Sequence, residues 1–267
     1  MPSLTEAIKR QVFKSPALTA TLRRLRVLLH HAARQPHEAD FNFLRHPAFA
    51  SGLLLDLGAN IGQSALSVHK VQPALQVLSI EANPACEPGL RMTRRLLGGK
   101  FSYRLLGVGA QAGDLPFYVP VRSSRMLLEE GTFALHSLQT AASVARLGRL
   151  GQDYTLHTLQ IPVLPVDALG LAPRVVKMDL QGLELAALAG MRQTLLRHQP
   201  ALMLEVGDNQ PAVVAWLAAL GDLGHLGYAP YFWDGQALQP GQRENSLNAM
   251  FLVNGDAVLK ARPGPAL

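Results

Sequence analysis

The segment Leu53–Gly62, in which an apolar run leads into a glycine-spaced turn, constrains the fold of this chain most strongly. A strand that is buried on both faces of a parallel sheet has a continuous apolar sequence, as Leu53–Leu57 does. Gly58 and Gly62 let backbone and ligand approach closely where a side chain would collide. The spacing Asp-x-Gly-x-Asn-x-Gly differs from the dinucleotide and phosphate-loop motifs. The segment therefore predicts a nucleotide crevice for a ligand without a pyrophosphate, and a plain strand-to-helix turn is the alternative.

A second apolar run, Val77–Glu81, ends in an acidic residue. Nucleotide-binding α/β folds place a carboxylate for the ribose hydroxyls about 20 residues after the first turn. A carboxylate accepts two hydrogen bonds at once and therefore suits a vicinal diol. Glu81 is the ribose candidate, and a surface acid at a strand end is the alternative.

Three ordered motifs resemble those of the FkbM family of S-adenosylmethionine-dependent methyltransferases, namely Leu55–Gly62, Ile80–Pro84 and Val176–Glu184. The similarity extends over about residues 50–207. Ala82 stands where the family usually has proline, and Gln181 stands where it usually has glutamate. The second difference removes a carboxylate near the expected reaction centre.

The resemblance implies an α/β fold of the Rossmann-like class I methyltransferase type, with a doubly wound, mostly parallel sheet and S-adenosylmethionine as cofactor. The turn would hold the methionine portion, with Asp56 near the ammonium group directly or through water, although a helix cap or turn acid is the alternative for this residue. Glu81 would bind the ribose, and Val108 with Gly109 would flank the adenine. The expected cofactor-binding residues are Asp56, Gly58, Ala59, Asn60, Gly62, Glu81, Ala82, Asn83, Val108 and Gly109.

Asp179 is the first candidate for catalysis, because it ends an apolar strand where a partly desolvated carboxylate acts strongly on a nearby proton. Glu184 follows at helical spacing and either faces the same crevice or is an acid favoured by the helix macrodipole. His136 is the third candidate, and a surface histidine is its alternative. Lys177, two residues before Asp179, is assigned no role.

The predicted reaction is methylation of a hydroxyl group on a sugar, glycan or secondary metabolite. Removing a hydroxyl proton requires a base or a metal, whereas an amine needs less help, so N-methylation of an amine or peptide is the alternative that fits Gln181. A noncatalytic binding or assembly module is a further alternative, which the glycine turn and Glu81 argue against. No spacing specific to metal ligands supports a magnesium site at Asp179, Glu205 and Asp208, and we predict no obligatory metal.

The pattern of the chain predicts a basic helical extension and connector over residues 1–50, a methyltransferase domain over 51–255 with an insertion at 121–160, and a tail over 256–267. Strands alternate with helices, which predicts an open sheet with ligands at the carboxyl ends of its strands. The expected strands are 53–57, 76–81, 101–108, 115–120, 174–179, 201–206, 228–233 and 248–253, and the expected helices after the connector are 63–71, 85–97, 182–197 and 210–223.

Composition narrows the environment and the partners of the chain. The single cysteine, Cys86, excludes an internal disulfide and fits a reducing compartment. The sequence has no apolar stretch that could span a bilayer and no signal-peptide pattern, so we expect a cytoplasmic protein. Aromatic residues make up only 6% of the chain and do not interleave with a basic patch, which argues against nucleic acid. The expected partner is a small-molecule or glycan methyl acceptor. The sequence leaves open whether the chain forms a homo-oligomer.

The net charge of +6 is carried entirely by residues 1–36. Within them, Leu18–Leu29 combines leucines with three arginines. Such a segment either lies on an anionic membrane surface, lies near an acidic substrate, or packs its leucines on the catalytic domain with its arginines in water. We favour the packed helix.

Overall fold

The computed structural model describes residues 16–122, 125–126, 131–133, 155–180, 182–205, 210–224, 227–241 and 248–253. His136, Gln181 and Asp208 lie outside these ranges, as does most of the predicted insertion. Within the described part of the chain, no helix combines the length and the apolar character needed to cross a membrane.

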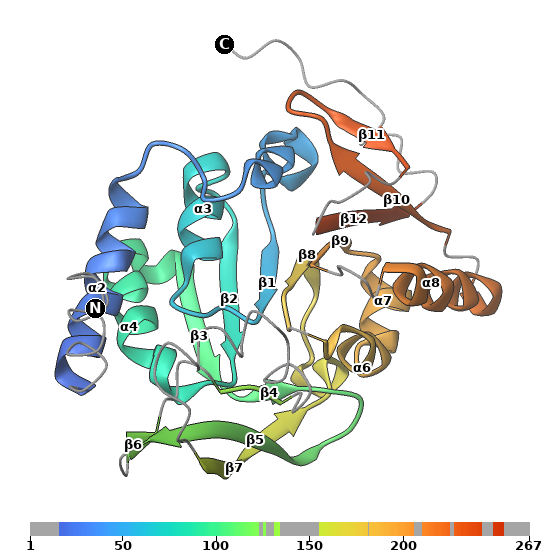
Figure 1. The fold of residues 1–267 in the computed structure, drawn as a ribbon. Coiled ribbons are helices and arrows are strands. Elements are labelled where there is room, and N and C mark those ends of the chain that lie inside the picture. Colours follow the sequence, from blue (N-terminus) through green and yellow to red (C-terminus); the bar gives the residue numbers. More distant parts are fainter. Residues whose placement is uncertain are drawn as a thin grey trace, which may run out of the picture.

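The core is an eight-stranded sheet in the order β11-β10-β12-β9-β8-β1-β2-β3 (Figure 1). Five neighbouring strands are parallel and three at one edge are antiparallel. The parallel strands are β1 (Leu53–Leu57), β2 (Gln76–Glu81), β3 (Phe101–Leu105), β8 (Pro173–Met178) and β9 (Ala201–Glu205), and the antiparallel ones are β10 (Tyr228–Trp233), β11 (Leu238–Pro240) and β12 (Asn248–Val253). The chain leaves β1 toward β2 and later returns to β8 on the other side, so a topological switch point lies between β1 and β8.

Helices cover both faces of this sheet, as a doubly wound fold requires. Side chains alternate across each strand, so Leu54 packs on one face while Leu55 and Leu57 pack on the other. The first face is covered by α2 (Pro16–Ala32), α3 (Gln63–Val71), α4 (Glu87–Leu97) and the 3-10 helix η1 (Ala39–Arg45); the second is covered by α6 (Glu184–Ala189), α7 (Arg192–His198) and α8 (Gln210–Gly224). The predicted fold class is confirmed.

Several element boundaries differ from the prediction. The expected strand 101–108 ends at Leu105, and Gly107–Val108 form the separate strand β4. The expected helix 182–197 is divided into α6 and α7, because the backbone of Gly190 packs directly on Gly109 and the helix turns there. The short edge strand β11 was not predicted.

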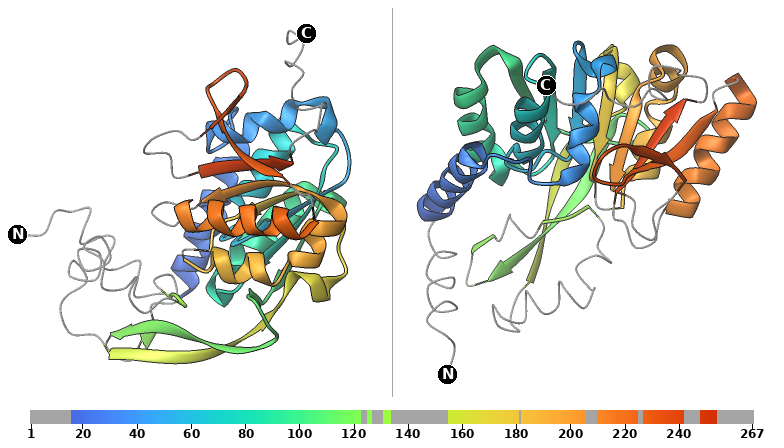
Figure 2. Two further views of the ribbon diagram at one scale, coloured as in Figure 1. Left: turned by 90° about the vertical axis from the view of Figure 1, so that its right-hand side faces the viewer. Right: turned by 90° about the horizontal axis from the view of Figure 1, so that it is seen from above.

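A second sheet contains β4, β5 (Gly113–Arg122), β6 (Arg125–Met126) and β7 (Thr155–Leu164). Residues 155–160, which the sequence placed in an insertion without strong periodicity, belong to β7. They pair antiparallel with β5, and Figure 2 shows the two strands side by side as a long twisted ribbon. The ribbon has a small apolar cluster of Phe117, Val119 and Ile161.

The N-terminal helix α2 packs differently from our expectation. Only Val27 of its apolar residues is fully buried in the core, while Leu25 and Leu29 are 49% and 64% exposed. The backbone carbonyl of His30 accepts a hydrogen bond from Lys70 Nζ, which ties the end of α2 to α3. The favoured interpretation, in which the leucines pack on the domain, was therefore wrong.

Candidate active site

A layer of polar side chains occupies the carboxyl-terminal end of the central sheet on the α3 face. Asp56 lies beside Ser79 of β2 and Lys177 of β8 in the strand register, and Glu205 lies beside Asn248 of β12. Their apolar neighbours alternate onto the opposite face, which is why these five residues share one side. Four strands and the antiparallel edge thus bring distant residues to a single place.

Lys177 lies at the centre of this layer. Its Nζ atom is 3.8 Å from Oδ1 of Asp56 and 3.5 Å from Oδ2 of Asp179. Burial acts to lower the pKa of Lys177, but the two carboxylates outweigh it and raise the pKa above its usual range. Lys177 is therefore a buried cation that holds two acidic side chains together.

Asp56 has no exposed surface. Ser79 Oγ donates to its Oδ2 at 2.7 Å, whereas no hydrogen-bond donor among the described residues reaches Oδ1. Burial raises the pKa of Asp56 above its usual range, against the opposing effect of Lys177. The expected direct contact with a ligand does not fit this buried position, and Asp56 instead supports Lys177 from behind the crevice.

Asp179 and Glu205 form a carboxyl pair at the ends of β8 and β9. Asp179 keeps 25% of its side chain exposed, so it faces solvent more than Asp56 does. Burial, followed by the charge of Asp179 and a hydrogen bond with it, raises the pKa of Glu205 to about 7. The charge of Asp179 thus makes the ionisation of Glu205 unfavourable until the pH is near neutral. The pair therefore forms a candidate proton acceptor.

The connector before the sheet also reaches this layer. Asn248 Nδ2 donates to Oε2 of Glu38 and to Oδ2 of Asp40, each at 3.1 Å. His37 fixes the connector on α3, because its backbone N–H donates to Ser67 Oγ at 3.0 Å. The hydrogen bond with His37 lowers the pKa of Glu38, so this acid is ionised beside the pair. Sequence reasoning treated the connector as irregular and did not find this contribution.

The predicted ribose residue, Glu81, ends β2 beside the glycine turn. Its Oε2 accepts from the backbone N–H of Asn60 at 2.6 Å, and its Oε1 accepts from that of Asn83 at 2.7 Å. Burial raises the pKa of Glu81, and these two N–H groups counteract the rise. Each oxygen uses one lone pair in this way and keeps another, so the carboxylate is held rigidly with two acceptor positions free for a diol.

The glycines of the turn are required by the protein itself. Gly58 has a φ of 82°, and a Cβ there would lie 1.8 Å from the backbone oxygen of Asp179. Gly62 has a φ of 92°, and its Cβ would lie 2.7 Å from Thr93 Oγ1. These positive φ values favour glycine, and close packing excludes a side chain. The turn after β1 is thus locked against the loop that carries Asp179.

The remaining cofactor candidates divide between the crevice and the core. Asn60 is exposed at the turn and Ala59 is buried beneath it. Val108 lies in the core of the α6 face, and the N–H of Gly109 donates to the carbonyl of Leu164. The role of Val108 and Gly109 as walls of an adenine slot stays a prediction.

An aromatic surface of the second sheet lies close to the ribose candidate. Ala82, next to Glu81, packs against the cluster that contains Phe117, and Phe133 belongs to the same cluster. The rings of Phe117 and Phe133 make an edge-on contact with centroids 5.0 Å apart. Phe133 also packs over Gly107, where a Cβ would lie 3.3 Å from its ring. The partly buried ring of Phe133 offers the flat apolar surface that an adenine needs, and the buried ring of Phe117 packs against it.

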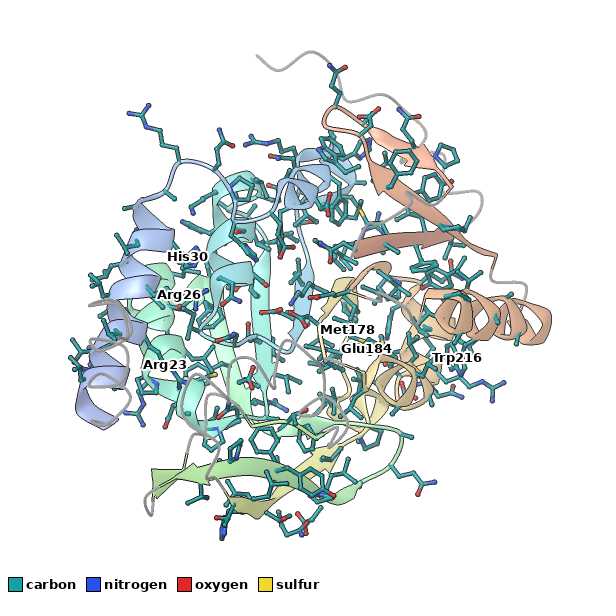
Figure 3. The ribbon with its side chains drawn as sticks, in the orientation of Figure 1. Arg23, Arg26, His30, Met178, Glu184 and Trp216 are labelled. Atoms are coloured by element: carbon teal, nitrogen blue, oxygen red, sulfur yellow. The ribbon has the colours of Figure 1, made fainter. Side chains whose placement is uncertain are left out.

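Of the catalytic candidates, Glu184 is the one that the structure contradicts. Glu184 is 2% exposed, and its carboxylate accepts hydrogen bonds from the backbone N–H groups of Leu180 and Gly182. Figure 3 shows it at the start of α6, below the end of β8 where Met178 is labelled. Glu184 therefore orders the loop after Asp179 and begins the helix, which was the alternative that the sequence left open.

The crevice has features that fit an adenosine with an amino-acid tail. The rigid carboxylate of Glu81 suits the ribose, and Ala82 with the phenylalanine pair borders it. Gln63 begins α3 directly after the turn, and its buried Oε1 has no hydrogen-bond partner among the residues that the structure describes. A ligand N–H or ammonium group would satisfy that oxygen. Among the same residues, no group of three His, Cys, Asp or Glu side chains is arranged to hold a metal, and metal independence stays a prediction.

Sequence reasoning missed Lys177, Gln63 and Glu38 as members of the site. Lys177 carried a usable signal, because a charged residue within a strand buried on both faces must have a partner. Glu205 was considered as a strand-end acid and as a metal ligand, but not as a proton acceptor. The pairing of β8 with β1 and of β12 with β9, which joins these residues, depends on the tertiary fold.

Comparison with known proteins identifies the family of the chain. The family described as methyltransferase FkbM domain matches residues 56–228, more than half of the chain. No curated protein matches the chain. The structure is similar to methyltransferase FkbM from Methylobacillus flagellatus KT, at 17% identity with a TM-score of 0.50, covering 76% of this chain and 44% of that one. This chain thus corresponds to less than half of that protein, and the likeness shows the fold.

Weaker structural similarity extends to two other methyltransferases. One is a putative O-methyltransferase from Klebsiella pneumoniae, at 14% identity and a TM-score of 0.40, covering 87% of this chain and 90% of that one. The other is human methyltransferase-like protein 13 in complex with SAH, at 13% identity and a TM-score of 0.38, covering 85% and 91%. On the match to its family, the chain belongs to the FkbM methyltransferases and is an S-adenosylmethionine-dependent methyltransferase.

Proposed function

We propose that this methyltransferase acts on a hydroxyl group of a sugar, glycan or other metabolite. The observation that carries the proposal is the carboxyl pair of Asp179 and Glu205, in which Glu205 has a pKa of about 7. A general base works best when its pKa lies near the working pH. A hydroxyl acceptor needs such a base, whereas an amine does not.

The proton of the acceptor hydroxyl would pass to this pair as the oxygen attacks. Bound S-adenosylmethionine supplies an electrophilic methyl group. Lys177 lies 3.5 Å from Asp179 and would hold that side chain in place beside Glu205. Alignment of the acceptor oxygen with the methyl carbon would supply most of the remaining acceleration, up to about 7–11 kcal/mol in favourable cases.

The cofactor would bind on the β1–β2 side of the crevice. Glu81 would accept hydrogen bonds from both ribose hydroxyls, and the partly buried ring of Phe133 would border the adenine. The amino-acid tail would extend toward the turn at Gly58 and toward Gln63, whose unpaired amide oxygen suits the ammonium group. This arrangement leaves the β8–β9 side for the acceptor.

The charges on the acceptor side favour an uncharged acceptor. Asp179, Glu205 and Glu38 surround this side, and Lys177 is already engaged by two carboxylates. A phosphate or carboxylate on the acceptor would meet like charge near its reacting oxygen, which is unfavourable by several kcal/mol in a partly buried site. Neutral polyols fit best.

Transfer of an isotopically labelled methyl group tests the proposal. The protein is incubated with methyl-labelled S-adenosylmethionine and either a panel of neutral glycosides and polyols or a panel of primary and secondary amines, and the products are identified by mass spectrometry. Labelled methyl ethers would support the proposal. Labelled N-methyl products from the amine panel alone would overturn it and favour N-methylation.

A further inference from the structure

Four leucines of α2 form an exposed apolar face, here called the leucine face. Leu22, Leu25, Leu28 and Leu29 are 40%, 49%, 41% and 64% exposed. Successive residues of a helix are rotated by about 100°, so these four lie within about 60° of Leu25. The face is an arrangement of the whole helix rather than a scatter of single residues.

The leucine face is bordered by arginines on both sides. Arg24 and Arg26 are each rotated by about 100° from Leu25, in opposite directions, and both are exposed. The sequence of α2 contains no acidic residue. Long cationic side chains at the edges of an apolar stripe can reach outward while their leucine neighbours are buried. This is the arrangement of a helix that lies in a membrane interface.

The opposite side of α2 is fixed to the enzyme. Val27 is fully buried in the core, and the His30 carbonyl accepts a hydrogen bond from Lys70. Figure 3 shows Arg23, Arg26 and His30 along α2 at the outer edge of the molecule, away from Met178 and Glu184 near the end of β8. The helix therefore keeps its leucines outward on a rigid body, and a surface could bind them without unfolding α2 or covering the crevice.

We infer that the leucine face docks the enzyme on an anionic lipid surface. Charge complementarity favours this occupant, because lipid headgroups with negative charge would meet Arg24 and Arg26 while the leucines enter the acyl boundary. A second copy of the chain fits less well. Packing two leucine faces together would bring the bordering arginines of one copy close to those of the other, and their like charges would repel. The charge of residues 1–36, which holds the whole net charge of +6, acts in the same direction.

Vesicle sedimentation with the full chain tests this docking. We expect the protein to sediment with vesicles of phosphatidylcholine mixed with phosphatidylglycerol, to stay in solution with phosphatidylcholine alone, and to be released by high salt. The double variant Leu25→Gln/Leu29→Gln should bind at least about tenfold more weakly. The double variant Arg24→Gln/Arg26→Gln should bind about thirtyfold more weakly, at about tenfold per 1.4 kcal/mol.

Matched controls separate docking from folding and from general charge. Leu115→Gln/Leu156→Gln changes two leucines of similar exposure on the second sheet, and Arg192→Gln/Arg197→Gln changes two exposed arginines on α7. Both should bind like the unaltered protein, and all four variants should keep its thermal midpoint. Absence of sedimentation with the anionic vesicles would overturn the inference. A lipid-free dimer that only the leucine-face variant abolishes, measured by analytical ultracentrifugation, would overturn it in favour of a second copy.

Discussion

At the scale of single residues, the protonation of Glu205 decides whether the proposed chemistry can occur. Its pKa is about 7 instead of its ordinary value of 4.5, so it is largely protonated below neutral pH and cannot then accept a proton. We expect kcat to rise with pH through about 7 and to level off above it. The variant Glu205→Gln should lose about a hundredfold or more in kcat and lose this rise, with KM for the methyl donor unchanged.

The stability of the same variant provides the control. A raised pKa means that protonated Glu205 stabilises the folded state fully below pH 4.5, and that this contribution is lost as the pH rises from about 4.5 to 7. At pH 8 the Glu205→Gln variant should therefore be at least as stable as the unaltered protein in a thermal melt. A pH profile of kcat that keeps its rise near 7 in the variant would rule out Glu205 as the base.

The ion pair of Lys177 and Asp56 gives a second prediction. Replacing Lys177 by methionine leaves the fully buried carboxylate of Asp56 without its cation, so unfolding in urea should show a loss of about 3–5 kcal/mol. The double variant Lys177→Met/Asp56→Asn removes the charge as well and should regain most of that loss. Additive losses in the two single variants would contradict a direct coupling between these residues.

At the scale of elements, the turn after β1 is locked to the loop after β8. In Gly58→Ala, the new Cβ would meet the Asp179 carbonyl at 1.8 Å, so one of the two loops must move. We expect a loss of at least about 3 kcal/mol in the free energy of unfolding, measured by urea titration, together with a large fall in kcat.

Gly170→Ala is the matched control for this turn. Gly170 also has a positive φ, of 62°, but a Cβ there has no atom within 4 Å. Its substitution should cost only about 1–2 kcal/mol of backbone strain and leave kcat unchanged. Equal effects of the two alanines would mean that strain alone, and not the contact with Asp179, makes Gly58 necessary.

The elements that the sequence predicted well are those with continuous local patterns. β1, β2, β10 and β12 were predicted at their observed residues, because each is a short apolar or aromatic run with clear breaks. The break between α6 and α7 was missed, because it depends on the contact of Gly190 with Gly109, which lies in another part of the fold. β11 is only three residues long and has no periodicity of its own.

At the scale of the whole molecule, the site depends on pairing between distant segments. Asp179 and Glu81 were found from strand-end motifs, since parallel strands share one carboxyl-terminal edge. The partnership of Lys177 with Asp56, and of Asn248 with Glu38, required the strand register and the course of the connector. The orientation of α2 could not be predicted, because the sequence does not show which side of the helix meets α4. In the structure the side with Val27 is buried, and the side with Leu25 and Leu29 is exposed.

We expect two adjoining halves of one crevice, with the cofactor over β1 and β2 and the acceptor over β8 and β9. Glu81 lies at the end of β2, and the Asp179–Glu205 pair lies at the ends of β8 and β9, on the other side of β1 in the same sheet. The switch point between β1 and β8 is where open α/β sheets bind their ligands. The reacting carbon should therefore lie above the junction of β1 and β8.

A crystal structure of the protein with S-adenosylhomocysteine tests this arrangement most directly. We expect both ribose hydroxyls to lie within hydrogen-bond distance of the Glu81 carboxylate, with the sulfur atom turned toward Asp179. Density for the ligand at any other place, or a ribose that does not contact Glu81, would contradict it.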